Sequence, residues 1–299
     1  MILEPANQVQ LYGLRNEFSE LVNLYNEKRF PNKILLSGQK GSGKCTLAYH
    51  LINFILSRNE EHSYDNENFL INENNKSFKL ILNKSNPNFN LIDINPDKKS
   101  IEISQIRNLI NNMNKSSFNS KPRFVLIDNI EYLNLNSINA LLKILEEPSQ
   151  NIFFLLIHNN KKILPTLKSR CLNFKISLSH DSSNKIIEKL LNSKILNLIN
   201  KDLLDYYYTP GKIYNLIIFA DQNNIDLKNI KLDEFLNLVI EKLYFKKDTS
   251  IKYMIYEFIE LFFSKNISLN NSNFLKKVAN TKKYNLDEET LFLEIKNCL

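Results

Sequence analysis

The segment of the chain best suited to chemistry is a glycine-rich loop at residues 38–44. Three of the five glycines, Gly38, Gly41 and Gly43, lie in it, and Lys44 completes the spacing G-x-x-x-x-G-K. Glycines at these positions let backbone N–H groups converge on phosphate oxygens, while the lysine reaches the outer phosphates. A helix that begins at Lys44 adds the positive end of its dipole. The pattern predicts nucleotide binding; a glycine turn that binds nothing is the alternative.

The residue after this lysine departs from what magnesium binding requires. Loops of this kind place a Ser or Thr hydroxyl there, and this chain has Cys45. A thiol is a poor ligand for a hard cation that prefers oxygen. Thr46 is no simple substitute, because one step along a helix turns the side chain by about 100°. We therefore expect the loop to hold phosphate but to organise its metal weakly.

A second candidate motif is an apolar strand that ends in an acid. Residues 124–131 read FVLIDNIE, which places Asp128 where a metal-side carboxylate is required. An acid that only closes a strand is the alternative. ATPases of this general build usually have glutamate next, whereas Asn129 cannot take up a proton from the attacking water. Glu131 lies beyond the strand end, and we expect it to cap or solvate the following turn.

Short strands must position these motifs, and they alternate with helical patterns in the first part of the chain. Apolar runs predict strands at 33–37, 90–94, 124–127, 153–157 and 172–176. Helical spacing of apolar residues predicts helices at 44–56, 101–113 and 137–147. This alternation favours an α/β fold with a parallel sheet covered on both faces. Residues 58–89, rich in Asn, Glu and Ser, are expected to form an extended surface insertion.

The strand signal fades after residue 176, and amphipathic helices follow. We expect three domains: a nucleotide-binding core at 1–177, a helical lid at 178–225 and an all-helical domain at 226–299. Helices are expected at 232–245 and 251–263 in the last domain. Their apolar residues either form an interface that holds an assembly together or only close the domain's own core.

Composition excludes several classes of protein. Hydrophobic residues make up 43% of the 299 residues, and no run approaches the roughly eighteen apolar residues of a membrane span. The first ten residues lack a basic leader, so no signal peptide is expected and the protein is expected to work in the cytoplasm. Cys45, Cys171 and Cys298 are too far apart in sequence to suggest a metal cluster or disulfide framework. The net charge of +7 is compatible with a polyanionic partner but does not require one.

Residues 139–171, NALLKILEEPSQNIFFLLIHNNKKILPTLKSRC, closely resemble the clamp-loader branch of the AAA+ ATPases. The most diagnostic elements are LLKILEEP at 141–148, LPT at 164–166 and SRC at 169–171. Together with GKCTLA at 43–48 and Pro210-Gly211, the resemblance covers most of the first two expected domains. It implies an AAA+ core that binds ATP or ADP with magnesium, followed by a helical lid and a helical collar.

The resemblance also implies roles for two basic residues. Arg170 would be an arginine finger that reaches the nucleotide site of a neighbouring ATPase subunit; a surface arginine is the alternative. A planar guanidinium stabilises charge on a transferring phosphoryl group in a way that lysine cannot reproduce. Lys212 stands where the family often has a second sensor arginine, although it could equally be solvated. The first sensor falls at His158 or Asn159, and neither is a typical choice.

The candidate site therefore combines residues of two kinds. The predicted catalytic residue is Arg170, acting in trans. The predicted nucleotide-binding residues are Gly38, Gly41, Ser42, Gly43, Lys44, Cys45, Thr46, Asp128 and Lys212. Some members of the family carry a cysteine zinc module between the two nucleotide motifs. Residues 58–123 contain no cysteine, so we expect no zinc.

Three functions compete on this evidence. The resemblance favours a hydrolysis-impaired stator in a hetero-pentameric DNA polymerase III clamp loader, with gamma/tau and delta subunits as partners and the sliding clamp and primed DNA as targets. The alternative is an active ATPase subunit of the same machine, favoured by the intact loop and Asp128 but opposed by Cys45 and Asn129. A DNA-binding protein acting alone rests only on the net charge, because the sequence has no helix-turn-helix or stacking-aromatic signature.

Overall fold

The computed structural model describes residues 3–95, 98–113, 119–146, 151–160, 163–247, 249–265, 269–284 and 286–299. These residues form two compact units, an α/β unit at residues 3–179 and a helical unit at 180–299. The change from mixed to helical structure was predicted at residue 176. None of the helices in the described ranges is long and apolar enough to cross a bilayer.

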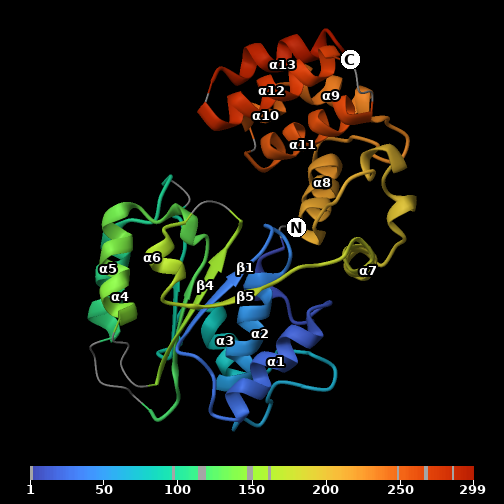
Figure 1. Cartoon of the computed structure of the whole chain (residues 1–299). Coiled ribbons are helices and arrows are strands. Elements are labelled where there is room, and N and C mark those ends of the chain that lie inside the picture. Colours follow the sequence, from blue (N-terminus) through green and yellow to red (C-terminus); the bar gives the residue numbers. More distant parts are fainter. Residues whose placement is uncertain are drawn as a thin grey trace. The chain divides into compact units, whose positions relative to one another are not determined.

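A five-stranded parallel sheet forms the centre of the first unit, in the order β2-β3-β4-β1-β5 (Figure 1). Its strands are β1 Lys33–Ser37, β2 Phe89–Ile92, β3 Arg123–Ile127, β4 Ile152–His158 and β5 Leu172–Lys175. The five predicted strands are confirmed, with ends that shift by one or two residues. Because the strands are parallel, their carboxyl ends meet at one edge, where both nucleotide motifs lie.

Helices cover both faces of the sheet, as predicted. One face carries α1 Arg15–Asn26, α2 Lys44–Leu56 and α3 Lys76–Leu82, and the other carries α4 Ile103–Met113 and α5 Leu135–Glu146 (Figure 1). Alternate strand residues such as Val125 and Ile127 pack with Leu109 of α4 and Leu141 of α5. The helix predicted at 137–147 begins two residues earlier, and Glu147 lies outside the described residues.

The prediction of an extended surface insertion at 58–89 is wrong. The segment contains α3, and it buries Tyr64, Ile71 and Phe78 among its apolar residues. The side-chain amides of Asn75 and Asn53 of α2 exchange two hydrogen bonds of 3.3 Å in the buried region. The polar composition was misleading because some of these polar side chains are hydrogen-bonded inside the unit instead of facing solvent.

The second unit contains helices joined by turns, and no strand among its described residues. Its helices are α7 His180–Leu191, α8 Pro210–Gln222, α9 Leu232–Glu241, α10 Tyr244–Lys247, α11 Thr249–Lys265, α12 Leu269–Tyr284 and α13 Glu288–Lys296. One hydrophobic core extends along the sequence from Ile187 to Ile295. The helix predicted at 232–245 is interrupted, because Leu243 adopts a positive φ of 52° between α9 and α10. The lid boundary at 225 stays a prediction.

Candidate functional site

The phosphate loop joins β1 to α2, and its glycines are required for two different reasons. Gly41 and Gly43 have φ values of 83° and 85°, in the left-handed region that favours glycine. At Gly38 the reason is close packing, because a Cβ there would lie 2.3 Å from the carbonyl oxygen of Ile176. Gly43 is the residue immediately before α2, so the loop ends on the free N–H groups of that helix. This is the backbone arrangement that binds phosphate.

Lys44 directs its ammonium group back into the loop. Its Nζ atom donates to the carbonyl oxygens of Gly38 at 3.1 Å and Gln39 at 2.6 Å, and it lies 3.4 Å from the Oγ atom of Ser42. The residue is 3% exposed. Burial lowers the pKa of Lys44 to about 8, while the nearby carboxylate of Asp128 acts in the opposite direction. A buried cation held by weak neutral acceptors is suited to bind an anion that enters the loop.

The Cys45 thiol and the Asp128 carboxyl group lie close enough together for each to shift the pKa of the other. Burial, and next the charge of Asp93, raise the pKa of Asp128 to about 6. Burial and Asp128 raise the pKa of the Cys45 thiol well above its usual value, so it stays protonated. A protonated thiol is a poor ligand for Mg²⁺, so of the two residues only the Asp128 carboxylate suits a magnesium ion.

Side chains from three strand ends form a hydrogen-bonded network next to this pair. The Nδ2 atom of Asn129 donates to Oδ1 of Asp93 at 2.8 Å, and its Oδ1 atom accepts from Nδ2 of Asn159 at 3.0 Å. The backbone N–H of Asn159 donates to Glu131 at 3.3 Å. Glu131 is therefore partly engaged with the end of β4, where the sequence analysis expected it only to cap or solvate a turn.

The sequence analysis missed Asp93 and set Asn159 aside, although the chain contains a signal for the former. Asp93 follows β2 in the sequence Leu-Ile-Asp at 91–93, and Asp128 follows β3 in the same sequence at 126–128. Two adjacent parallel strands that end in the same three residues place both acids at one edge of the sheet. Asn159, one of the two first-sensor candidates, is the member of the network that β4 contributes.

Arg170 lies in the turn between α6 Pro165–Lys168 and β5. Its guanidinium forms an ion pair of 2.7 Å with Glu146, at the end of α5, and donates to the carbonyl oxygen of Thr166 at 3.0 Å. A third of the side chain is exposed to solvent. Exposed ion pairs contribute little to stability, so a competing anion can draw the guanidinium away at small cost. The next residue, Cys171, packs against the core, and burial raises its pKa to about 11.

The remaining predicted residues differ in how the structure places them. Ser42 is buried in the loop beside Lys44, and Thr46 is partly buried on α2. Lys212 belongs to the helical unit, where its Nζ atom pairs with Oε1 of Glu257 on α11 at 2.5 Å. Its role in nucleotide binding stays a prediction.

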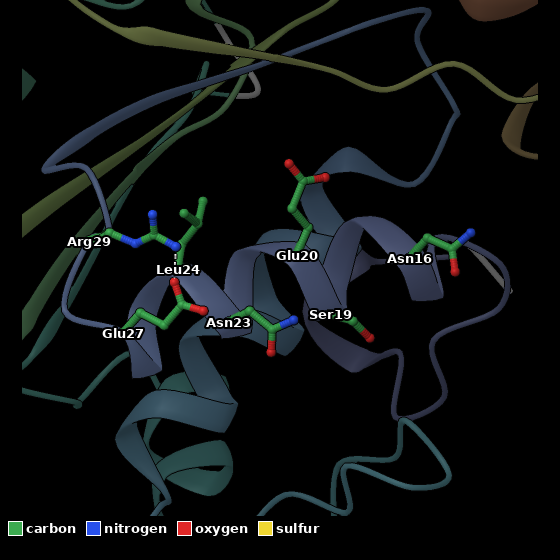
Figure 2. A pocket seen from close by; sticks show the side chains of 7 residues that line it. All are labelled: Asn16, Ser19, Glu20, Asn23, Leu24, Glu27 and Arg29. Carbon is green, nitrogen blue, oxygen red and sulfur yellow. Dashed lines mark hydrogen bonds and ion pairs between the residues drawn. The ribbon is translucent and has the colours of Figure 1, made fainter.

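A separate pocket lies along α1, and Figure 2 shows the side chains that line it. The lining residues are Asn16, Ser19, Glu20, Asn23, Leu24, Glu27 and Arg29. Glu27 and Arg29 form an ion pair there (Figure 2). None of these residues belongs to the phosphate loop or to the acidic strand ends, so the pocket is not part of the candidate nucleotide site.

Comparison with known proteins gives several matches. Residues 13–180 match the family described as DNA polymerase III, delta subunit. A DNA polymerase III subunit delta' from Buchnera aphidicola subsp. Schizaphis graminum is 26% identical over 90% of this chain and 83% of its own length. The subunit delta' of Pseudomonas aeruginosa is 35% identical over 32% of this chain and 30% of its own length. A solved gamma subunit-related protein from Thermotoga maritima has a TM-score of 0.49 and 16% identity, covering 93% of this chain and 97% of that protein.

Proposed function

Because this chain belongs to the DNA polymerase III delta-subunit family and is a clamp-loader subunit of that polymerase, we propose that it acts as a hydrolysis-impaired stator. In this role it binds ATP or ADP without turning it over and supplies Arg170 to a neighbouring ATPase subunit. The assembly is a hetero-pentamer with gamma/tau and delta subunits, which places the sliding clamp on primed DNA in the cytoplasm.

The observation that carries the proposal is that a thiol, Cys45, lies beside Asp128 at the position where a hydroxyl would hold magnesium. The two residues occupy the positions from which a nucleotide-bound metal would be organised, and they offer it one carboxylate and a thiol in place of a hydroxyl. Asn129, at the position of the usual base, holds its amide between Asp93 and Asn159. Cys45 thus supplies no hard metal ligand, and Asn129 supplies no group that removes a proton from water.

The position of Arg170 supports a role in trans. The guanidinium is partly exposed and is held by one surface ion pair and one backbone carbonyl. Within the described residues, both of these contacts lie at the surface, so their loss should not unfold the protein. An arginine finger must leave its resting contacts and meet phosphate oxygens on another subunit, and weak exposed contacts permit this.

Phosphate release by the isolated chain tests the impaired site. We expect ATP hydrolysis at background, equal in the wild type and in Lys44→Ala, because neither can activate water. The runner-up function, an active ATPase subunit, is favoured by the correctly placed Lys44 and Asp128. A robust rate that disappears in Lys44→Ala would establish the runner-up and reject the stator.

ATP turnover by reconstituted clamp loaders tests Arg170. Arg170→Ala should assemble normally but lower clamp- and DNA-stimulated turnover, because a finger contributes about 10³ to 10⁵ in rate at its own site. The fall is smaller if other subunits supply fingers to other sites. Arg170→Lys should restore little of the turnover, because an ammonium group lacks the planar fork of a guanidinium.

Arg29→Ala, at an arginine whose side chain is 70% exposed, is the matched control, and loaders that carry it should turn over ATP normally. Equal turnover by correctly assembled wild-type and Arg170→Ala complexes would refute the role.

A further inference from the structure

The side chain of Asn129 is engaged at both ends. Its amide nitrogen donates to Asp93 at 2.8 Å, and its amide oxygen accepts from Asn159 at 3.0 Å. Asn129 therefore links a residue that follows β2 to a residue that follows β4. Only a side chain that carries both a donor and an acceptor can make both bonds, and an amide is the group of this size that does so.

Asp93 is itself fixed by its surroundings. Its Oδ1 atom also accepts from the backbone N–H of Ile94 at 2.7 Å. Its backbone carbonyl accepts from Nε2 of Gln105, on α4, at 2.8 Å. The backbone of Asp93 is thus anchored to a helix on one face of the sheet, and its carboxylate is held by the N–H of the next residue, so Asp93 can fix the position of Asn129.

We propose that Asp93 is a positioning residue that holds Asn129, and through it Asn159, as a fixed rim beside the phosphate loop. The inference rests on the proposed function, since it explains how the nucleotide site keeps its shape without a catalytic base. It also assigns position 129 a requirement for a neutral amide. A carboxylate there would lose the donor to Asp93 and add a third negative charge close to Asp93 and Asp128.

A consequence is that restoring the usual glutamate does not restore a working site. In Asn129→Glu the new carboxylate is repelled by Asp93, so the rim opens and the protein loses stability. Replacing Asp93 by asparagine at the same time removes the repulsion, because the amide of the new residue can donate to the glutamate. The two positions are therefore coupled through charge.

Thermal unfolding of the full chain measures this coupling. Asn129→Gln is the matched control, because glutamine has the size of glutamate and the same difficulty with the positive φ of 55° at this position. We expect Asn129→Glu to melt about 5 °C below Asn129→Gln. Adding Asp93→Asn should recover most of that difference in the glutamate variant and none in the glutamine variant. The proposal is overturned if Asn129→Glu and Asn129→Gln melt at the same temperature. It is also overturned if Asp93→Asn changes the melting temperature of both variants by the same amount.

Nucleotide binding separates positioning from stability alone. With a fluorescent ADP analogue, Asp93→Ala should bind about tenfold more weakly than the wild type, because Asn129 is then no longer held in place before the nucleotide binds. Asp93→Asn keeps an acceptor for the Asn129 amide and should bind as the wild type does. If Asp93→Ala binds normally and only melts lower, Asp93 has a structural role and the positioning role is rejected.

The two experiments also separate this inference from the function on which it rests. If the wild type binds no nucleotide, the nucleotide-binding part of the proposed function fails, while the melting comparison still decides whether Asp93 and Asn129 are coupled. If nucleotide is bound but the double substitution does not restore the melting temperature, the proposed function is retained and the positioning role of Asp93 is rejected.

Discussion

At the residue scale, the phosphate loop separates two tasks that usually occur together. Lys44 is placed to meet an anion, because its ammonium group donates to the neutral carbonyl oxygens of Gly38 and Gln39 inside the loop. Cys45 offers a thiol at the position where a hydroxyl would hold magnesium, so this position gives a metal ion no hard ligand. Phosphate binding and ATP hydrolysis thus depend on different side chains, so a loop of this kind can lose hydrolysis and still bind phosphate.

His50 on α2 provides a residue-scale prediction about pH. It is fully buried, with Nε2 donating to the carbonyl of Gln8 at 3.0 Å and Nδ1 within 2.9 Å of the Tyr64 hydroxyl. Burial lowers the pKa of His50 to about 4, below its ordinary value of 6.5. The unfolded chain therefore takes up a proton that the folded protein excludes, so stability falls as pH drops from 6.5 towards 4, by about 3 kcal/mol.

Urea unfolding at several pH values checks this prediction. Asp128 acts in the opposite direction, because its raised pKa of about 6 makes its protonation in the folded state favourable as pH falls. The change in stability with pH must therefore be compared between the wild type and variants that lack one histidine. The loss of stability between pH 6.5 and 4 should shrink in His50→Gln and persist in the control His62→Gln, at an exposed histidine. Identical pH profiles for His50→Gln and the wild type would contradict the prediction.

At the scale of elements, the edge of the sheet depends on the close approach of the loop after β1 to the chain after β5. Gly38 makes this possible, because any side chain there would strike the backbone of Ile176. At Gly43 an added Cβ would meet only a side-chain methyl group of Leu14 at 3.2 Å. Gly38, whose φ of 157° is itself rare for other residues, combines backbone crowding with an unfavourable backbone conformation, whereas Gly43 has left-handed strain with little crowding.

We expect Gly38→Ala to lower the free energy of unfolding more than Gly43→Ala. The left-handed conformation makes Gly43→Ala cost about 1 to 2 kcal/mol. Gly38→Ala should cost about 3 kcal/mol, because β1 or the end of β5 must move to make room. Urea titrations measure the loss in free energy of unfolding for each variant. An equal or smaller loss for Gly38→Ala would show that β1 or the end of β5 can move without the expected penalty.

At the scale of the whole molecule, the helical unit changes how an assembly role can be tested. The apolar residues of the segment from residue 226 onward were the candidates for an interface. Four of them, Leu236, Val239, Ile255 and Phe258, are buried in the unit's own core, whereas Phe262 is partly buried against it and Leu243 is 38% exposed. That core also includes Ile187 and other residues before 226. Removing residues from 229 onward would therefore expose apolar surface and unfold the unit, so loss of assembly after truncation would prove nothing.

Exposed apolar residues allow a cleaner test of the prediction that residues from 226 onward hold the assembly. Leu286 and Leu293 are each 52% exposed, and Leu196, outside that segment, is 62% exposed. We expect Leu286→Ser with Leu293→Ser to weaken co-purification with partner subunits, because burying a leucine contributes about 1.5 to 3 kcal/mol. Leu196→Ser is the control. Normal assembly of the double variant would reject these two leucines as contacts, and an equal loss in the control would show that the effect is not specific.

The sequence alone determined the features that depend on neighbouring residues. The phosphate loop, the five strands and the position of Arg170 in a turn before β5 follow from glycine spacing, apolar runs and short motifs. These patterns are local, since strand and helix periodicity and glycine conformation depend on residues a few positions apart. The same locality explains why the break at Leu243 was missed, because nothing nearby in the sequence requires its positive φ.

Only the tertiary structure decided which side chains meet at the edge of the sheet. Cys45 reaches Asp128, and Asn129 joins Asp93 to Asn159, because the strand order places β2, β3, β4 and β1 side by side. Residues 58–89 likewise join the core through contacts with α2 that their polar composition conceals. Such contacts join residues tens of positions apart, and their energies depend on strand order and burial, which local composition does not encode.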